Sequence, residues 1–505
     1  MLTSISLKRI SPFVRDISIT SLTAIITAIC NVFLIRIISN AFGADELGVY
    51  TLVRRTVATL IPFTSLSIGI GIARYIALYT GKGEKTESVL PAAATVSLTC
   101  SLLVCLALLP FSELFSECIF DEKGRSNLFD SILFLLVGEN LFVCLYAYYR
   151  GRQQILSANI WSAFILGIMP VSITLLIIYI GIANNVNYII WGIGSLFYLS
   201  LFNLLPKIAF GLRSITVKEF KSTAAKLLAY SIPRAPGGMA LTLIFTFGVL
   251  VSPYTGGIAN AAYMSIGIWI FQLFQTATDS FGMVVLPKVA NLLGRGNEDY
   301  LIDKLRSIYD LIMHVGLFIV IQLFLVVDFL IFVWLGIEYS DAVPIARIVI
   351  LAMMPFLFFS MMRNIIDAVE KRAVNTINTY LSLFITIVIS LLLMKLGMGL
   401  VALAVGFDTG LILLGILTYI YMNRRYHIKL LSNNFYSILL INMMMGLFIY
   451  LVKNKMMSNY FSYQNVVIVV LAQLLCGILY MFILSKLDAT WIRDIEERIV
   501  RRCHN

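Results

Sequence analysis

The chain has 505 residues, of which 60% are hydrophobic and only 13% are charged, and its mean hydropathy is +0.91. Soluble domains average roughly 45 to 50% apolar and about 25% charged residues, and a soluble core could not bury this surplus. The composition therefore predicts an integral membrane protein and excludes a large soluble catalytic domain. Because a spanning helix needs about 20 apolar residues, the length allows roughly fourteen spans.

Apolar runs separated by charged and turn residues predict an all-α fold of about fourteen transmembrane helices. We expect these helices at residues 17–39, 47–79, 89–111, 131–149, 158–181, 188–206, 228–252, 259–286, 308–335, 345–367, 376–394, 400–422, 435–452 and 464–485. One set of alternate connections holds 26 of the Lys and Arg residues, and the opposite set holds five. Because cytoplasmic connections carry the excess positive charge, both termini are predicted to be cytoplasmic.

A weak internal repeat relates the second predicted helix to the eighth. A shift of 213 residues pairs Tyr50 with Tyr263 and Gly69 with Gly282. Six helices separate the equivalent elements, so both copies cross the membrane in the same sense, as in a parallel repeat. We therefore predict two six-helix lobes that rock around a site between them. The expected divisions are an N-lobe over 1–206, a cytoplasmic linker over 207–227, a C-lobe over 228–422, two further helices over 423–485 and a cytoplasmic tail over 486–505.

Several arginines lie at membrane depth, where a charge costs about 2.5 to 3.5 kcal/mol and normally faces a water-filled cavity or a partner. Arg54 and Arg55 begin seven residues into the helix predicted at 47–79, too deep for easy escape to the interface. Arg234 lies in a segment with two prolines and two glycines, 232–238, which is expected to break the helix. These three residues are candidates for an anion site, with a simple kinked cap as the alternative for Arg234.

Arg36 and Arg347 lie near span ends, where a long side chain can instead reach the interface. Both are weaker candidates for substrate binding.

Polar residues on three predicted helices follow helical spacing, as the walls of an aqueous cavity would require. In the helix at 259–286 these are Gln272 and Asp279, with Gln275 at the edge of the same face, and Asn31 lies on the polar face of the first helix. The helix at 47–79 carries Thr51, Arg55 and Thr59 on one face.

The carboxylates at membrane depth are Glu139, Asp279, Asp328 and Asp408. They either pair with the arginines or bind a coupling cation, H⁺ or Na⁺. We single out Asp279, Glu139 and Asp408 as candidates for ion coupling.

Other chemistry has little support. The three histidines and seven cysteines show no metal-ligand spacing, and we expect no metal and no cofactor. The net charge of +11 is explained by topology and by attraction to anionic lipid headgroups, so no nucleic-acid partner is expected.

Arginines in a cavity open to the cytoplasm favour an anionic substrate, because the guanidinium fork matches phosphate oxygens. Export of a negative charge from a negative cytoplasm is favoured by about 2.3 kcal/mol per 100 mV. A phosphate-bearing lipid headgroup fits both conditions.

Five short segments resemble the polysaccharide or oligosaccharide flippases, including the Wzx type, of the multidrug/oligosaccharidyl-lipid/polysaccharide (MOP) exporter superfamily. These segments are residues 43–50, 71–75, 79–83, 230–237 and 257–263. The resemblance covers nearly the whole chain and implies flipping of an undecaprenyl-pyrophosphate-linked oligosaccharide, a repeat unit of O-antigen, capsule or exopolysaccharide, to the outer leaflet of the plasma (inner) membrane by alternating access. The family's cationic lumen would map onto Arg54, Arg55 and Arg234. Other polysaccharide-assembly proteins are possible partners.

Three other functions are weighed. Residues 13–16 resemble the start of the lipid II flippases of peptidoglycan synthesis, but other features of that family are missing. Drug exporters of the superfamily usually have twelve helices rather than fourteen. A membrane-embedded glycan polymerase or acyltransferase needs a general base or a large outer loop, whereas the longest predicted outer loop, 112–130, offers only carboxylates, two cations and one cysteine. A transporter, not an enzyme, is therefore expected.

Overall fold

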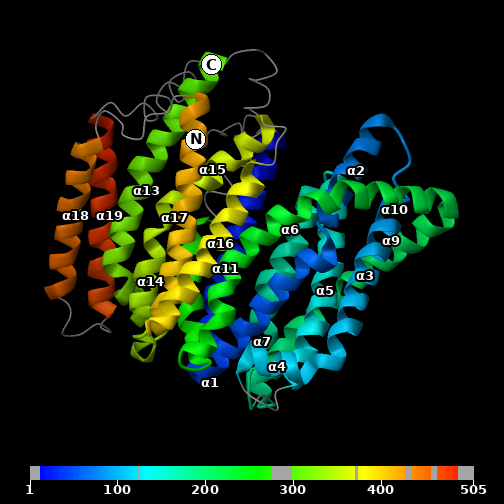
Figure 1. The fold of residues 1–505 in the computed structure, drawn as a ribbon, viewed down its shortest axis with the longest axis horizontal. Coiled ribbons are helices and arrows are strands. Elements are labelled where there is room, and N and C mark those ends of the chain that lie inside the picture. The colour runs from blue at the N-terminus through cyan, green and yellow to red at the C-terminus, as the bar shows by residue number, and fades with distance from the viewer. Residues whose placement is uncertain are drawn as a thin grey trace, which may run out of the picture. The chain divides into compact units, whose positions relative to one another are not determined.

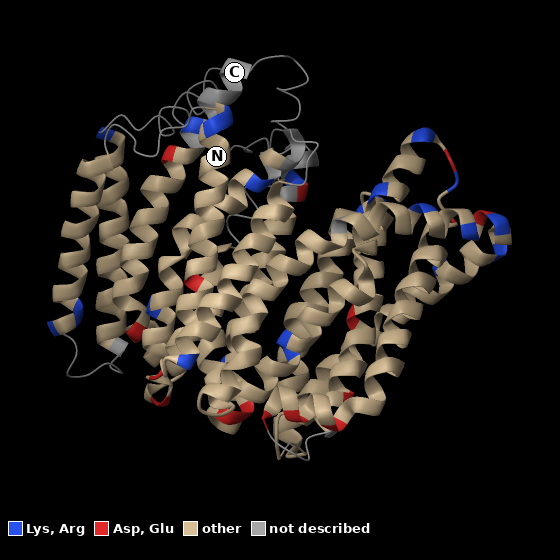
Figure 2. Ribbon diagram, viewed as in Figure 1, with Lys and Arg blue, Asp and Glu red and all other residues tan. Residues whose placement is uncertain are grey.

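The computed structural model describes residues 12–121, 126–182, 184–275, 298–369, 374–426, 435–455 and 463–486. All regular structure in these residues is helical, as predicted (Figure 1). Eleven helices in the described part are long and apolar enough to cross a membrane, and a pair bent by 46°, α14 with α15, would make a twelfth. Charged residues lie mostly toward the helix ends and leave long uncharged middle sections (Figure 2). The chain is therefore an all-α, multi-pass membrane protein.

The chain divides into two compact units, residues 1–262 and 263–505. Unit 1 contains α1 (Pro12–Ser65), α2 (Ile68–Lys82), α3 (Val89–Leu108), α4 (Ser112–Phe120), α5 (Ser126–Gly151), α6 (Ile155–Ala163), α7 (Met169–Ile180), α8 (Asn187–Tyr198), α9 (Ser200–Ser214), α10 (Val217–Ser231) and α11 (Ala235–Val251). A helix over 259–275 crosses the boundary. Unit 2 contains α13 (Glu298–Trp334), α14 (Ala342–Leu351), α15 (Met353–Val369), α16 (Val374–Lys395), α17 (Gly399–Tyr426), α18 (Phe435–Lys455) and α19 (Tyr463–Lys486).

The first two predicted spans differ in detail from the structure. Gly43, with φ 79° and ψ −172°, divides α1 into two helices, as the two predicted spans require. The second helix ends at Ser65, and Leu66 and Ser67 then take positive φ values before α2 begins. The span predicted at 47–79 is thus a broken helix. Left-handed backbone is unfavourable for leucine and serine, so neither Leu66 nor Ser67 predicted this break; Pro62, four residues before Leu66, was the available signal.

Two other predicted features are clarified. The predicted outer loop at 112–130 contains the nine-residue helix α4. The break predicted at 232–238 is confirmed, because α10 ends at Ser231 and a 3₁₀ turn, Ile232–Arg234, precedes α11.

Helix α10 occupies part of the segment predicted as a linker. A capping box stabilises its start: the Thr216 hydroxyl accepts from the Glu219 backbone N–H at 3.2 Å, and the Glu219 carboxylate accepts from the Thr216 N–H at 2.8 Å. The Thr216 backbone N–H and the Thr216 hydroxyl both donate to the Glu219 carboxylate and hold the pKa of Glu219 below its usual value.

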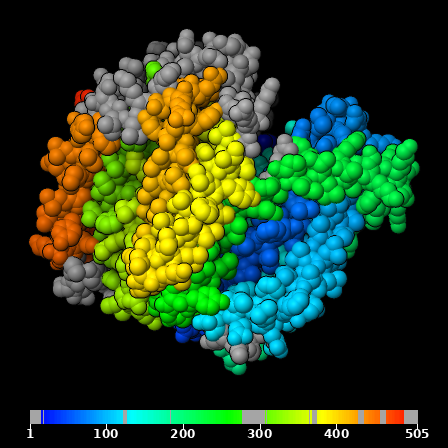
Figure 3. Space-filling model, in the orientation of Figure 1, coloured from blue at the N-terminus to red at the C-terminus, as the bar shows by residue number. Residues whose placement is uncertain are grey.

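Close helix packing in unit 2 depends on small residues. α16 and α17 run side by side (Figure 3), and a Cβ at Gly406 or Gly410 would overlap the side chains of Ser390 or Thr386. Small residues of this kind let membrane helices approach each other closely. α18 and α19 pack on α13 through a separate apolar cluster that includes Phe329.

Candidate functional site

Two predicted site residues meet in unit 1. Arg54 on α1 donates from Nη1 to Oε1 of Glu139 on α5. The Arg54 side chain is 35% exposed and that of Glu139 is 13% exposed. Sequence analysis left two roles open for Glu139, pairing with an arginine or ion coupling, and the structure forms the pair with Arg54.

Two further side chains, those of Tyr50 and Arg55, interact with this pair. Tyr50, one helical turn before Arg54, is buried and interacts electrostatically with both charges. Arg55 is half-buried, and its positive charge acts on that of Arg54. The cluster of Arg54, Arg55 and Glu139 therefore carries one net positive charge within two candidate membrane spans, α1 and α5.

The threonines of the predicted polar face on this helix are satisfied inside unit 1. Thr51 is buried and donates to the Gly48 carbonyl at 2.8 Å. Thr59 lies 2.9 Å from the hydroxyl of Thr246 on α11, which links the two helices. These contacts give Thr51 and Thr59 a packing role.

The α1–α5 interface also contains a buried amide that sequence analysis missed. Asn140, 1% exposed, donates to Thr64 on α1 at 2.8 Å and accepts from Ser97 on α3 at 3.4 Å. Its position next to Glu139 in an apolar run was the available signal. A satisfied buried network of this kind holds α1, α3 and α5 in one arrangement.

The first segment of α1 carries two other predicted residues. Asn31 is exposed and donates to the carbonyl of Thr27 in its own helix at 3.0 Å. Arg36, five residues later, is half-buried.

Unit 2 contains a second charge cluster, which includes the predicted residue Arg347. Oδ2 of Asp328 on α13 accepts from Arg347 Nη2 on α14 at 3.1 Å and from Lys453 Nζ on α18 at 2.7 Å. Lys453, only 6% exposed, also donates to the Leu325 carbonyl at 2.8 Å. We call Asp328, Arg347 and Lys453 the charged triad. Sequence analysis placed Lys453 in an outer connection, because it lies near the end of an apolar run.

Asp408 on α17 does not join either cluster among the described residues. It is 8% exposed, and it accepts a hydrogen bond from the backbone of Ala352, at the break between α14 and α15. Its Oδ1 is buried with no hydrogen-bond partner in the described part of the chain.

The remaining predicted residues are only partly described. Gln272 and Gln275 are half-buried in the helix over 259–275. The backbone of Arg234 forms the end of the 3₁₀ turn, whereas its side chain, like the whole of Asp279, lies outside the described residues.

Comparison with known proteins identifies solved structures that are similar to this chain. No protein-family model and no curated protein matches the sequence. A solved structure of the lipid II flippase MurJ in an inward closed conformation is similar, with a TM-score of 0.69, 15% identity, and coverage of 92% of this chain and 98% of that chain.

Two further solved structures are similar. An inward-facing multidrug resistance MATE family transporter of the MOP superfamily has a TM-score of 0.64 and 16% identity. The match covers 81% of this chain and 98% of that chain. A MOP superfamily transporter from Pyrococcus furiosus, described as having reverse polarity of its binding pocket, has a TM-score of 0.56, 15% identity and coverage of 82% and 96%. This chain therefore has the fold of the MOP superfamily transporters.

Proposed function

We propose that this protein is a plasma-membrane transporter that moves a polyprenyl-pyrophosphate-linked oligosaccharide from the cytoplasmic to the outer leaflet by alternating access. The observation that carries the proposal is the cluster of Arg54, Arg55 and Glu139. Two guanidinium groups at membrane depth, with one carboxylate, suit a substrate whose headgroup is a polyanion. The similar folds of a lipid II flippase and of MATE transporters support transport as the activity.

The ion pair also supports cation coupling. While Glu139 is ionised it holds Arg54, and a phosphate oxygen must compete with it for the same N–H groups. A proton or Na⁺ at Glu139 removes that competition and releases Arg54 for the substrate. Among the described residues, the charge of Arg55 and the phenol of Tyr50 act on this pair.

Arg234, Gln272, Gln275, Asn31 and Arg36 stay proposed substrate-binding residues, with Asp279 and Asp408 as further proposed coupling residues. Arg347 stays a weaker candidate for substrate binding, and in unit 2 it donates to Asp328.

The test is translocation of a polyprenyl-pyrophosphate glycan in proteoliposomes. Loss of a charge-assisted hydrogen bond costs about 1.5 to 3 kcal/mol, so Arg54→Ala and Arg55→Ala should each lower the rate by roughly 10- to 100-fold. Arg234→Ala should act in the same direction. Arg213→Ala, which removes an exposed charge at the end of α9, is the matched control and should keep the rate. Wild-type rates in all three lumen variants would refute the proposal.

Lipid II is the second candidate substrate, favoured by the coverage of 92% of this chain by the lipid II flippase fold. Both candidates share a polyprenyl pyrophosphate and differ in the sugar and peptide that follow it. Parallel assays with lipid II and with a peptide-free polyprenyl-pyrophosphate oligosaccharide distinguish them: selective transport of the oligosaccharide supports the proposal, whereas selective transport of lipid II replaces it.

A further inference from the structure

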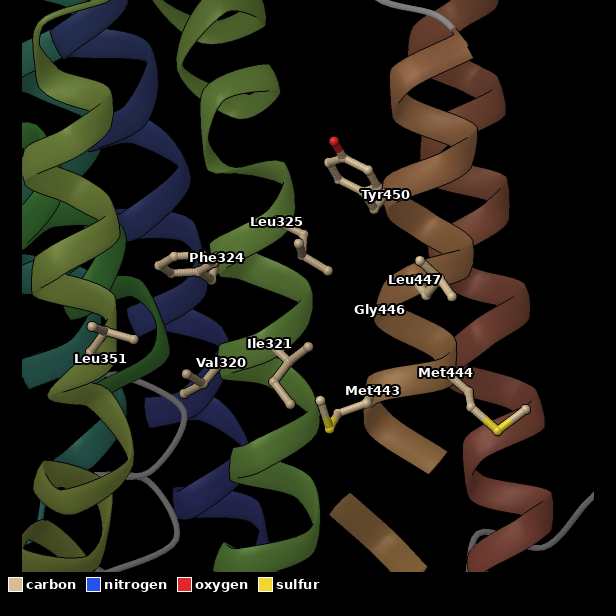
Figure 4. A pocket seen from close by; sticks show the side chains of 10 residues that line it. All are labelled: Val320, Ile321, Phe324, Leu325, Leu351, Met443, Met444, Gly446, Leu447 and Tyr450. Carbon is tan, nitrogen blue, oxygen red and sulfur yellow. The ribbon is translucent and has the colours of Figure 1, made fainter. Parts of the chain in front are cut away.

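Unit 2 contains an apolar groove between three membrane helices, with a volume of about 610 Å³ (Figure 4). Its walls come from α13, α14 and α18, and the Tyr450 hydroxyl is the one polar side-chain group among the lining residues. These are Val320, Ile321, Phe324, Leu325, Leu351, Met443, Met444, Gly446, Leu447 and Tyr450. The volume lies within the roughly 300 to 1,000 Å³ of known small-molecule sites.

The groove opens toward the surface of the helix bundle. Met443, Met444 and Leu447 are each about 60% exposed in the protein alone. A Cβ at Gly446 would lie 3.1 Å from side-chain carbons of Ile321 and Leu325, so this glycine keeps α18 close to α13 at one level of the groove. In a multi-pass membrane protein, such an exposed apolar surface faces acyl chains rather than water.

One end of the groove is charged, and each of the three helices contributes one charge there. Asp328 lies three residues after Leu325 on α13, Lys453 lies three residues after Tyr450 on α18, and Arg347 lies four residues before Leu351 on the antiparallel helix α14. These spacings place each charge about one helical turn beyond a lining residue. The charged triad therefore lies next to one end of the groove.

The charged triad has a net positive charge and one N–H donor without a partner among the described residues. Two cations share one carboxylate, which leaves one net positive charge. The Nε atom of Arg347 is buried and has no hydrogen-bond partner among the described residues. The Arg347 side chain is 37% exposed, and its Cζ lies 5.9 Å from the centroid of the ring of Phe324, which lines the groove. An anion next to Arg347 would thus sit directly over the apolar groove.

We propose that this groove is a binding site for a glycerophospholipid of the bilayer, with one acyl chain in the groove and an anionic phosphate headgroup at Arg347. Lys453 lies two residues before the end of α18, so the charged end of the groove is near the membrane surface. From Tyr450 to Met443 the groove extends about 10 Å toward the middle of the bilayer, at 1.5 Å per residue. In the predicted topology this is the outer leaflet. The proposal does not depend on what the protein transports.

The first experiment tests the proposed acyl-chain site by placing a bulky side chain in the groove. Full-length protein is purified in detergent, delipidated and titrated with phosphatidylglycerol, and bound lipid is counted by native mass spectrometry. Met443→Trp should lower the affinity of the tightest site by roughly tenfold, because the indole occupies the groove, which Met443 lines (Figure 4). The matched control is Met481→Trp, at a 47% exposed position on α19 outside the groove, which should bind as the wild type does.

The second experiment tests the proposed headgroup site by changing the charge of the lipid headgroup and of residue 347. Wild-type protein should bind phosphatidylglycerol more tightly than phosphatidylcholine of the same chains, and Arg347→Gln should remove this preference while Arg347→Lys keeps part of it. Equal binding by Met443→Trp and Met481→Trp, or an unchanged preference in Arg347→Gln, would overturn the proposal. Tighter binding of undecaprenyl phosphate than of phosphatidylglycerol at the Met443-sensitive site would also overturn it, by identifying a polyprenyl chain as the occupant.

Discussion

Gly48 of α1 lies directly against the backbone carbonyl of Ile258, at the start of the helix over 259–275. A Cβ at Gly48 would overlap the carbonyl oxygen and would lie 2.9 Å from both the carbonyl carbon and Cγ2 of Ile258. The two residues belong to two of the segments that resemble the flippase family, 43–50 and 257–263. The glycine therefore allows a backbone approach that joins these distant segments.

We expect Gly48→Ala to destabilise unit 1. The nearest neighbour is backbone and cannot move aside like a flexible side chain, so overpacking should cost about 1 to 3 kcal/mol. Thermal unfolding of the purified protein should show a lower Tm. Gly81→Ala is the control, because no described atom lies within 4 Å of the added Cβ. Equal Tm values for the two variants would contradict the close approach.

The ion pair between Arg54 and Glu139 should appear as energetic coupling. Arg54→Gln leaves the poorly exposed Glu139 carboxylate without the Arg54 guanidinium as its donor, which should cost about 1 to 3 kcal/mol, toward the lower end because Arg54 is partly exposed. Glu139→Gln alone should cost less, because the remaining guanidinium is more accessible. A double-mutant cycle of unfolding free energies measures the coupling. Strictly additive effects would show that the two side chains do not interact.

The charged triad predicts an order of destabilisation. Asp328→Asn removes the one anion and leaves the buried Lys453 charge uncompensated, so it should lower the Tm most. Arg347→Gln should have a smaller effect, because Asp328 keeps Lys453 as its partner. The order is measured by thermal unfolding in the same detergent, and a larger effect of Arg347→Gln would contradict this assignment.

The contact between α16 and α17 predicts different rescue at two glycines. Gly410→Ala would place a methyl group against the Thr386 hydroxyl, so Thr386→Ala should restore part of the lost stability. The added Cβ of Gly406→Ala overlaps Ser390 Oγ, and it also meets the Ser390 backbone N and the Thr386 carbonyl oxygen, each at 2.9 Å. Ser390→Ala removes only the first of these three contacts, so it should restore less stability than Thr386→Ala does at Gly410. Tm values of the single and double variants test this. Gly477→Ala, in α19 with no described atom within 4 Å of the added Cβ, controls for the glycine-to-alanine change itself.

The sequence by itself determined the all-α membrane fold, because hydropathy over about 20 residues decides whether a segment partitions into a bilayer. It also located the break at 232–238, since proline and glycine act through the local backbone. The same hydropathy pattern placed Arg54 and Glu139 inside predicted spans, 47–79 and 131–149.

Only the tertiary structure decided which charges meet. Arg54 and Glu139 are 85 residues apart, and Lys453 and Asp328 are 125 residues apart. Helical periodicity gives the face on which a residue lies, but the partner of that face depends on how whole helices pack. For the same reason, the sequence offered no sign of the groove between α13, α14 and α18, which exists only where three separate apolar surfaces meet.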